Sequence, residues 1–193
     1  MAVEIKNHSD GTIAGVTPEH QLEVESENHS LQHHVSFKQE NAYQVWDTVT
    51  LVNGTVTVLH LKNTDPDRVL VVSYMRVQMM DPGAGTAPPN AGTYFDFGLG
   101  RTVSSGGDTL TPVNMNAGSG KTASGTFTGN GPTMAGTFTE FDRWYVQADG
   151  VMMTYNKDGS LILGLNDTLE IRATHDNAAG TAYARVTFMM IDK

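Results

Sequence analysis

Residues 117–122 read AGSGKT and come closer to a chemical motif than other stretches of this sequence, because they end as a phosphate-binding P-loop does. A P-loop also needs a glycine five positions before its second glycine, so that backbone N–H groups can surround the phosphates. Met115 occupies that position relative to Gly120. The residues that follow, ASGTFTG, do not favour the helix whose N-terminus holds the anion. We therefore expect a surface loop here and no nucleotide site.

Four histidines within fifteen residues near the N-terminus are the second candidate, because imidazoles and nearby glutamates are ligands that zinc accepts. His33 and His34 are adjacent, so on a strand they point to opposite faces and do not bind one ion. The His-x-His spacing of a cupin-type jelly roll is also missing. A metal site within one chain is therefore not expected, although three chains around a threefold axis can each supply one imidazole. The favoured interpretation is partner contact by His20, His29, His33, His34 and Phe37.

The acidic turns and carboxylate pairs do not match a catalytic or calcium-binding pattern. Residues 63–68, NTDPDR, and residues 156–160, NKDGS, lack the spacing of an EF-hand loop, and a carboxylate in a turn commonly accepts hydrogen bonds from its own backbone. Neither a G-x-S-x-G elbow nor an H-E-x-x-H helix occurs. Glu140 with Asp142 is a pair of the kind that any β surface carries. We expect no enzymatic activity and no cofactor, and a cupin-type enzyme ranks third among the hypotheses.

Aromatic side chains keep a glycan-binding function open, since lectin-like sandwiches stack sugars on exposed rings. Alternation along strands places at least half of these rings in the core. Trp144 is an example of a ring that we expect to be exposed. The aromatic residues concerned are Trp46, Tyr94, Phe95, Phe97, Trp144 and Tyr145.

The composition indicates which elements position these residues. The chain of 193 residues has 20 Gly, no Cys and a charged fraction of 17%, which is typical of many short strands joined by glycine-rich turns. Without Cys, neither a disulfide nor a thiolate metal site can form. The composition predicts an all-β domain that is stabilised by packing and by contacts between chains.

The charge distribution and the apolar runs exclude several partners. The net charge is -9 and the 12 Lys and Arg residues are scattered, so nucleic acid is not an expected partner. No run approaches the ~20 apolar residues of a membrane span, and the first residues lack the apolar stretch of a secretory signal. We expect a protein that contacts neither nucleic acid nor membrane and that remains in the compartment where it is made.

Alternating apolar and polar residues predict strands from residue 43 onwards, each with one dry and one wet face; in residues 168–174, Glu170 and Arg172 fall on the wet face. Asn53-Gly54 lies between two such runs and predicts a hairpin, because a type I′ turn needs two residues that tolerate positive φ. With no crossover helix, the pattern predicts an antiparallel two-sheet sandwich of the jelly-roll kind. The expected strands are residues 43–52, 55–62, 68–79, 93–99, 108–115, 122–128, 143–147, 151–155, 161–163, 168–174 and 182–191.

The polarity of the chain divides it into an arm and a body. Residues 1–40 are rich in His, Glu and Asn, and too few of them are apolar to offset the ~1 to 2 kcal/mol per residue that backbone ordering costs. We expect an extended N-terminal arm at 1–40, which orders on a partner surface, and a sandwich at 41–193.

Two segments of the body are rich in Gly, Thr, Ser and Pro and predict surface loops or loose hairpins. They are residues 81–90 and residues 104–136. GTFT occurs at 125–128 and again at 136–139, which suggests the two edges of one projecting hairpin.

In the order of its segments, the chain resembles a group of tailed-bacteriophage virion proteins. The resemblance covers nearly the whole chain and rests on arrangement rather than on one short motif. Its parts are a DGT turn, VTPEHQLEVESEN, ENAYQV, the strand pair TVTVLHLKNTDPDRVLVVSYMRV, a Gly/Thr-rich middle, and LILGLNDTLEIRAT before the final strand.

The resemblance implies a non-enzymatic structural protein of a phage virion, of the capsid decoration or cement type, which stabilises the shell through subunit contacts. Such proteins commonly form homotrimers with an extended N-terminal arm. The expected partners are therefore other copies of the chain and the major capsid protein, on the capsid exterior, after synthesis in the host cytoplasm. The alternative is a tail or fibre subunit, an adhesin that binds host surface glycans.

Overall fold

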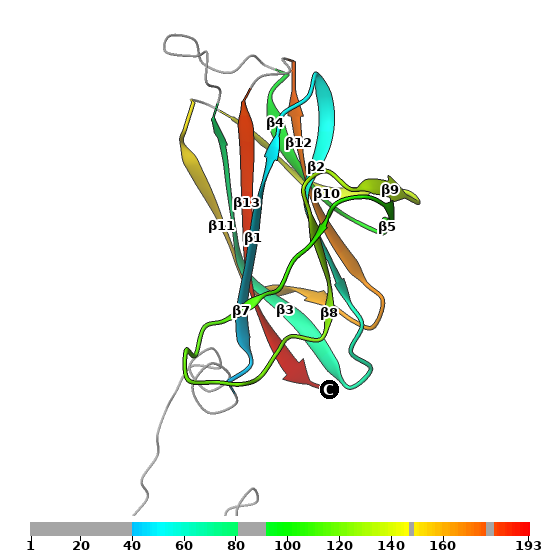
Figure 1. The fold of residues 1–193 in the computed structure, drawn as a ribbon, viewed down its shortest axis with the longest axis vertical. Coiled ribbons are helices and arrows are strands. Elements are labelled where there is room, and N and C mark those ends of the chain that lie inside the picture. The colour runs from blue at the N-terminus through cyan, green and yellow to red at the C-terminus, as the bar shows by residue number, and fades with distance from the viewer. Residues whose placement is uncertain (1–39, 81–91, 147–148, 177–179) are drawn as a thin grey trace, which may run out of the picture. The chain divides into compact units, whose positions relative to one another are not determined.

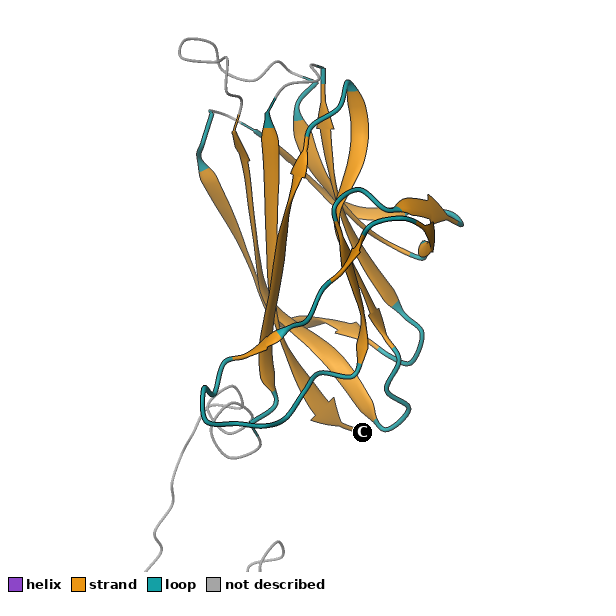
Figure 2. Ribbon diagram, viewed as in Figure 1, coloured by secondary structure: helices purple, strands orange, loops and turns teal. Residues whose placement is uncertain are grey.

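The computed structural model describes residues 40–80, 92–146, 149–176 and 180–193, and this part of the chain contains strands and loops without a helix (Figures 1 and 2). The chain divides into two units, residues 1–30 and 31–193, and all described residues belong to the second. The predicted arm, except for Glu40, and the loop predicted at 81–90 lie outside the described residues. The strands are β1 Ala42–Thr50, β2 Gly54–Asn63, β3 Arg68–Met80, β4 Tyr94–Leu99, β5 Thr102–Ser105, β6 Asp108–Thr109, β7 Val113–Asn114, β8 Gly125–Gly129, β9 Thr133–Ala135, β10 Thr139–Tyr145, β11 Met152–Leu163, β12 Thr168–His175 and β13 Thr181–Asp192.

Two antiparallel sheets form the layers of a sandwich (Figure 1). The five-stranded sheet has the order β11-β3-β13-β1-β7, and the six-stranded sheet has the order β10-β4-β12-β2-β8-β6. Among the long strands the first pairs with the last, β1 with β13, and pairing continues inwards through β2 with β12, β3 with β11 and β4 with β10. The predicted all-β two-sheet sandwich is confirmed, and this nested pairing is consistent with a jelly roll.

The dry faces of the two sheets meet in one core, and aromatic rings join the layers. Phe188 of β13 stacks on Tyr43 of β1, within the five-stranded sheet, at 5.7 Å between centroids, and on Phe127 of β8, in the six-stranded sheet, at 5.4 Å. Trp144 of β10 meets Tyr155 of β11 edge to face at 4.8 Å. Each contact with a ring on the facing sheet removes apolar surface from water. Full burial of a side chain of this size contributes about 1.5–3 kcal/mol to the free energy of folding.

The turn at Asn53-Gly54 connects the two layers instead of closing a hairpin, so the hairpin prediction is wrong. β1 lies in the five-stranded sheet and β2 in the six-stranded sheet. The backbone N–H of Leu51 donates to the carbonyl of Gly180 instead, at 3.0 Å, which ties the end of β1 to the segment before β13. The local preference of Asn53-Gly54 suits either a hairpin or a connection between the two sheets. The long pairings of β1 with β13 and of β2 with β12 decide for the connection.

The segment NKDGS forms a bulge within β11 and not the turn that was predicted. The register with β3 moves from Asn156 opposite Tyr74 to Leu161 opposite Val72, so residues 157–160 have no partners in that strand. The two strands expected at 151–155 and 161–163 are therefore one strand. Gly159 has a φ of 79°, a conformation that favours glycine over other residues.

The Gly/Thr-rich middle of the chain crosses between layers more often than expected. The strand expected at 108–115 is divided into β6, in the six-stranded sheet, and β7, in the five-stranded sheet. Of the two GTFT copies, one lies in β8 and the other leads into β10, so they are not the edges of one hairpin; the projecting pair is β5 and β9 (Figure 1). Residues 117–122 form a loop followed by β8 and not by a helix.

Candidate functional site

The residues predicted to contact partners, His20, His29, His33, His34 and Phe37, lie outside the described residues. Of the aromatic candidates for glycan binding, Phe95 and Phe97 are fully buried, whereas Trp46 is 43% exposed and Tyr145 is 54% exposed. Trp144 is packed against the core and contacts Phe97 at 5.5 Å, so its expected exposure is wrong. It lies on the inner side of β10, next to the edge strand of the facing sheet, where alternation along the strand directs it.

The outer face of the six-stranded sheet carries an ionic cluster, which we define as His60, Asp96, Arg143, Glu170 and Arg172. Asp96 of β4 stands between two arginines of the neighbouring strands. The Nε of Arg143 donates to Oδ1 at 2.7 Å, and Nη2 of Arg172 donates to Oδ2 at 2.9 Å. Asp96 is 1% exposed. Charge-assisted hydrogen bonds to both of its oxygens offset the cost of burying this carboxylate.

Glu170 of β12, expected on a wet face, is fully buried within this cluster. The hydroxyl of Thr57 donates to its Oε1 at 2.6 Å, and Nη1 of Arg101 lies 3.3 Å from the same atom. Arg101 follows β4 and also donates to the carbonyl of Met134 in β9 at 3.0 Å. The segment that carries β5 and β9 therefore covers the polar residues of the sheet, which sequence alternation alone could not indicate.

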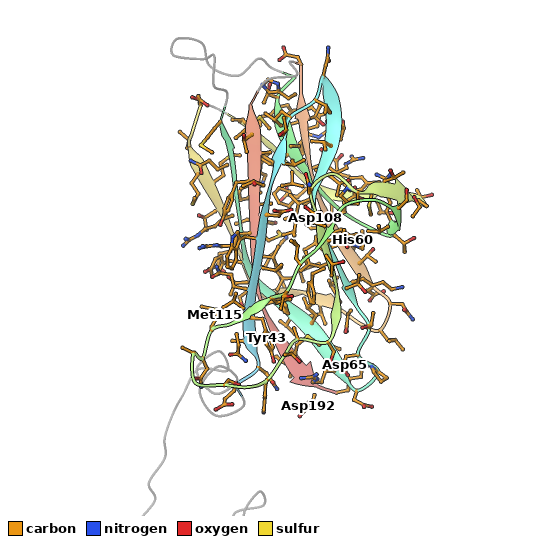
Figure 3. All side chains as sticks on the ribbon, in the orientation of Figure 1. Tyr43, His60, Asp65, Asp108, Met115 and Asp192 are labelled. Atoms are coloured by element: carbon orange, nitrogen blue, oxygen red, sulfur yellow. The ribbon has the colours of Figure 1, made fainter. Side chains whose placement is uncertain are left out.

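His60 of β2 lies directly opposite Glu170 in the register of the two strands, on the side of the sheet where β5 and β9 lie (Figure 3). Its Nε2 is 3.0 Å from the carbonyl oxygen of Arg101, which can only accept, so Nε2 carries a proton and donates it in this hydrogen bond. Burial lowers the pKa of His60 below its ordinary value; the hydrogen bond to Arg101 opposes this effect, and the charges of Lys62 and Arg101 add to it. His60 is 1% exposed, and its Nδ1 has no partner among the described residues.

Phe138 closes the cluster from outside. A side chain at Gly98 of β4 would meet the ring of Phe138 at 2.3 Å, so the ring rests directly on the backbone of the sheet. The guanidinium of Arg172 lies 3.4 Å from the ring centroid, in a cation–π contact. The carboxylates of the ionic cluster are therefore paired with Arg101, Arg143 and Arg172, and Arg101 also ties the cluster to β9 through the carbonyl of Met134.

The outer face of the five-stranded sheet is different in character, because two of its arginines, Arg76 and Arg185, form no ion pair with a carboxylate among the described residues. One row across this sheet joins four strands: Thr154 of β11 is opposite Arg76 of β3, which is opposite Arg185 of β13, which is opposite Trp46 of β1. Tyr183 flanks this row on β13, and Tyr74 flanks it on β3. We define the arginine–aromatic face as Trp46, Tyr74, Arg76, Tyr183 and Arg185.

Neighbouring groups hold the two arginines in place. The Cζ of Arg185 lies 6.0 Å from the ring centroid of Trp46, and the Cζ of Arg76 lies 5.1 Å from that of Tyr74. With its amide oxygen towards β13, Gln44 accepts hydrogen bonds from Nε and Nη2 of Arg185, both at 3.1 Å. Because guanidinium groups offer further donors in a fixed plane, this face can bind a carboxylate or another planar anion.

No protein-family model matches this chain, and no curated protein matches it. Among solved structures, "Structure of infectious bursal disease virus Gx strain" is similar at 12% identity, over 79% of this chain and 38% of that chain, with a TM-score of 0.15. This chain therefore spans well under half of the length of that solved chain. A TM-score of this size does not indicate a shared fold.

In the described ranges, no group of three or more His, Asp or Glu side chains could hold a metal ion. No helix of the described chain is long and apolar enough to cross a membrane.

Sequence reasoning missed the arginine–aromatic face, although part of its signal is in the sequence. Tyr74 and Arg76 alternate with apolar residues on one strand, as Tyr183 and Arg185 do on another. This alternation places each pair on an outer face. Only the register of β3 with β13 places the two arginines opposite each other, and that register depends on the whole sandwich.

Proposed function

We propose that this protein is a non-enzymatic structural protein of a phage virion, of the capsid decoration or cement type, that binds copies of itself and the major capsid protein on the capsid exterior. The observation that carries the proposal is the arginine–aromatic face. Trp, Tyr and Arg are the residue types enriched where protein interfaces have most of their binding energy. Trp46 is 43% exposed and stands opposite Arg185 at one end of the row across this sheet, so it is available as an anchor.

The rest of the molecule supports this assignment. The resemblance to phage virion proteins covers nearly the whole sequence, and decoration proteins combine a rigid body with a partner-binding arm. The body here is a two-sheet sandwich in which the buried carboxylates of Asp96 and Glu170 form ion pairs with arginines. A rigid body holds the arginine–aromatic face in one geometry, which reduces the conformational entropy that is lost on binding.

Cosedimentation with shells of the major capsid protein tests the proposal. Trp46→Ala should weaken binding to the shells by roughly 30-fold or more, which is the loss of about 2 kcal/mol expected for an interface anchor. Leu165→Ala is the matched control, because Leu165 is 46% exposed but lies in the turn between β11 and β12. Equal binding by wild type and Trp46→Ala would show that this face does not contact the shell.

Mass measurement in solution tests self-assembly. We expect an oligomer at micromolar concentration, with a trimer as the form that the resemblance implies. A stable monomer that also fails to bind shells would overturn the decoration-protein assignment.

The alternative is a tail or fibre subunit that binds host surface glycans, and exposed rings favour it at two positions. Trp46 and Tyr145 are 43% and 54% exposed and lie on different sheets. A glycan array separates the two functions, because a decoration protein should show no saccharide preference. An adhesin should bind specific sugars and lose that binding in Trp46→Ala or in Tyr145→Ala.

A further inference from the structure

Three rows of side chains cross the outer face of the five-stranded sheet, and we call them the outer rows. Each row joins β11, β3, β13 and β1, because residues that stand opposite each other on neighbouring strands point to the same face. All members but Thr187 are at least partly exposed. The first row is Met152, Gln78, Tyr183 and Thr48, the second is Thr154, Arg76, Arg185 and Trp46, and the third is Asn156, Tyr74, Thr187 and Gln44.

The outer rows have the composition of a protein interface. Trp, Tyr, Met and Arg fill six of the twelve positions, and these residue types are enriched at interfaces, where Lys, Asp and Glu are depleted. None of the twelve is Lys, Asp or Glu, although the chain has 21 Asp and Glu residues. The outer face of the six-stranded sheet, by contrast, carries the carboxylates of Asp96 and Glu170.

Arg76 and Arg185 are the charged residues of the outer rows, and they stand opposite each other. Like charges in this arrangement destabilise a sheet. Neither arginine forms an ion pair with a carboxylate among the described residues, and the buried Nε of Arg76 has no hydrogen-bond partner there. A carboxylate of another molecule that accepts from both guanidinium groups offsets the repulsion and reduces the cost of these unpaired donors.

We propose that the outer rows bind a carboxylate-bearing surface of a second copy of this chain, with a carboxylate between Arg76 and Arg185 and the ring of Trp46 as an anchor. This inference rests on the proposed function, in which copies bind one another, and it identifies the surface and the chemistry of that contact. Charge complementarity supports this partner. The chain has a net charge of -9, whereas the outer rows hold two arginines and no carboxylate, so a second copy presents the opposite charge on its other surfaces.

The size of the outer rows fits such an interface. Neighbouring strands lie about 4.8 Å apart, and outward positions on one strand lie about 6.6 Å apart, so the rows cover roughly 400 Å². A standard protein interface buries about 800 Å² on each partner. The outer rows therefore supply about half of one side of the interface, and the 43% exposed ring of Trp46 is available for burial there.

The charge of the outer rows also determines how the copies are arranged. Two copies that met through this same face would bring four arginines together without a carboxylate between them. The contact is therefore heterologous, which means that the outer rows of one copy meet a different surface of the next. Heterologous contacts form a closed ring when the rotation between copies closes, and a trimer is one such ring.

Sedimentation velocity of the full chain tests the contact. Arg76→Gln with Arg185→Gln should raise the Kd of self-association roughly 30-fold or more, the effect of about 2 kcal/mol on binding. Lys62→Gln with Lys121→Gln is the matched control, because it removes two positive charges from β2 and from the loop before β8. This control should not weaken self-association. A wild-type chain that stays monomeric at micromolar concentration, or equal weakening in both double variants, would overturn the inference.

A carboxylate supplied by the chain itself separates binding from folding. Thr154 is exposed and stands opposite Arg76, so Thr154→Glu creates a cross-strand pair of opposite charges, which stabilises a sheet. This variant should keep or raise the temperature of thermal unfolding and yet weaken self-association roughly tenfold or more, because its carboxylate takes the place of the partner's. Thr154→Gln, of the same shape without the charge, should leave both nearly unchanged.

The Thr154→Glu variant keeps the test decisive if the arginine-to-glutamine chain fails to fold, as judged by circular dichroism. Self-association that is as strong in Thr154→Glu as in Thr154→Gln would contradict the proposal.

Carbodiimide coupling identifies the partner. Arg76→Lys with Arg185→Lys keeps both charges and supplies amines, which the reagent joins to carboxylates in direct contact. In a mixture of ¹⁵N-labelled and unlabelled copies, mass spectrometry should find an introduced amine joined to an Asp or Glu of another copy. Amide bonds that form only within one chain, or only with the capsid protein when shells are present, would overturn the assignment to a second copy.

The remaining outcomes separate this inference from the proposed function. Self-association that depends on the two arginines, without binding to shells, would establish the contact between copies and remove the capsid assignment. Shell binding that depends on Trp46, with self-association unchanged in Arg76→Gln with Arg185→Gln, would assign this face to the capsid and overturn the inference. Binding of acidic saccharides that is lost in the same double variant, again with unchanged self-association, would assign the arginine pair to a sugar and overturn it as well.

Discussion

Gly98 of β4 leaves room for the ring of Phe138, which lies between β9 and β10. The ring of Phe138 occupies the space where any other residue would place a Cβ, and ring atoms would lie 2.3–2.7 Å from that carbon. Gly98→Ala should therefore displace the ring and lower the free energy of unfolding by about 1–3 kcal/mol, the usual range for overpacking. Urea denaturation measures the change.

The control for this prediction is Gly120→Ala, because a Cβ at Gly120 meets nothing within 4 Å. It should leave the free energy of unfolding nearly unchanged. Adding Phe138→Ala to Gly98→Ala should cost less than the sum of the two single changes, since the clash is then gone. Equal effects of the two alanine substitutions would mean that the ring does not rest on β4.

His60 predicts a pH dependence of stability. Its pKa is lowered in the folded state, chiefly by burial and also by the charges of Lys62 and Arg101, while Glu170 faces it from β12. The unfolded chain therefore binds the proton more readily. The contribution of His60 is fully present above its ordinary value of 6.5 and is lost as the pH falls from there towards the folded pKa, at about 1.4 kcal/mol per pH unit.

His60→Gln isolates this dependence, because a glutamine can still donate to the carbonyl of Arg101 but does not titrate. The difference in unfolding free energy between wild type and variant should be constant above pH 6.5 and should change below it. Identical slopes for both proteins between pH 6.5 and 5 would assign the titration to other groups.

At the scale of elements, Asp96 joins three neighbouring strands of the six-stranded sheet. It lies on β4 and pairs with Arg143 of β10 and Arg172 of β12. Asp96→Asn removes the charge that both guanidinium groups share and should destabilise the fold by roughly 3 kcal/mol. This loss is at the lower end of the range expected when a buried ion pair is broken, because both arginine side chains are partly exposed to solvent.

The matched control is Glu140→Gln, which breaks the pair that Arg143 forms at the surface. The Glu140 side chain is 37% exposed, so its removal should cost less than about 1 kcal/mol. Thermal unfolding of both variants makes the comparison. Similar losses would indicate that burial does not strengthen the Asp96 pairs.

The bounds of strands with strong alternation were predictable from the sequence, but the strands with which they pair were not. The alternation in β12 and β13 gave bounds within one residue of those observed. By contrast, Asn53-Gly54 suits either a hairpin or a connection between layers, and NKDGS suits either a turn or a bulge. The choice depends on which distant strand offers hydrogen bonds, and a single sequence does not contain that information locally.

The same limit applies to the candidate site. Alternation correctly placed Glu170 and Arg172 on the outer face of β12, but their burial comes from Phe138 and Arg101, more than thirty residues away in sequence. Likewise, the arginine pair is created by the register of β3 with β13. The residues predicted from the histidine cluster lie outside the described residues, so that prediction stays untested.

At the scale of the whole molecule, the decoration-protein hypothesis predicts that the body folds without the arm and that the arm is needed for attachment to the capsid. Among the described residues the core begins at Ala42 and Tyr43, and Phe188 of the body stacks on the rings of Tyr43 and Phe127. Removal of residues 1–40 should therefore leave the sandwich folded, with a cooperative thermal transition. Under this hypothesis it should abolish cosedimentation with capsid shells, because the arm is proposed to supply the contacts that fix the protein to its partners.

A hydrogen bond between Glu40 and Asn114 lies at the point where this truncation cuts the chain. The backbone carbonyl of Glu40 accepts a hydrogen bond from the side chain of Asn114 at 2.8 Å, so a cut after residue 40 removes a partner from β7 as well as the arm. A second truncation that begins at Glu40 keeps this bond and should recover up to roughly 1 kcal/mol of stability. Both truncated chains should lose attachment equally, because stability at β7 and binding by the arm are separate properties. Shell binding that survives in the chain that begins at Glu40 would place attachment in the body alone, and it would leave the arginine–aromatic face free to contact the shell without the arm.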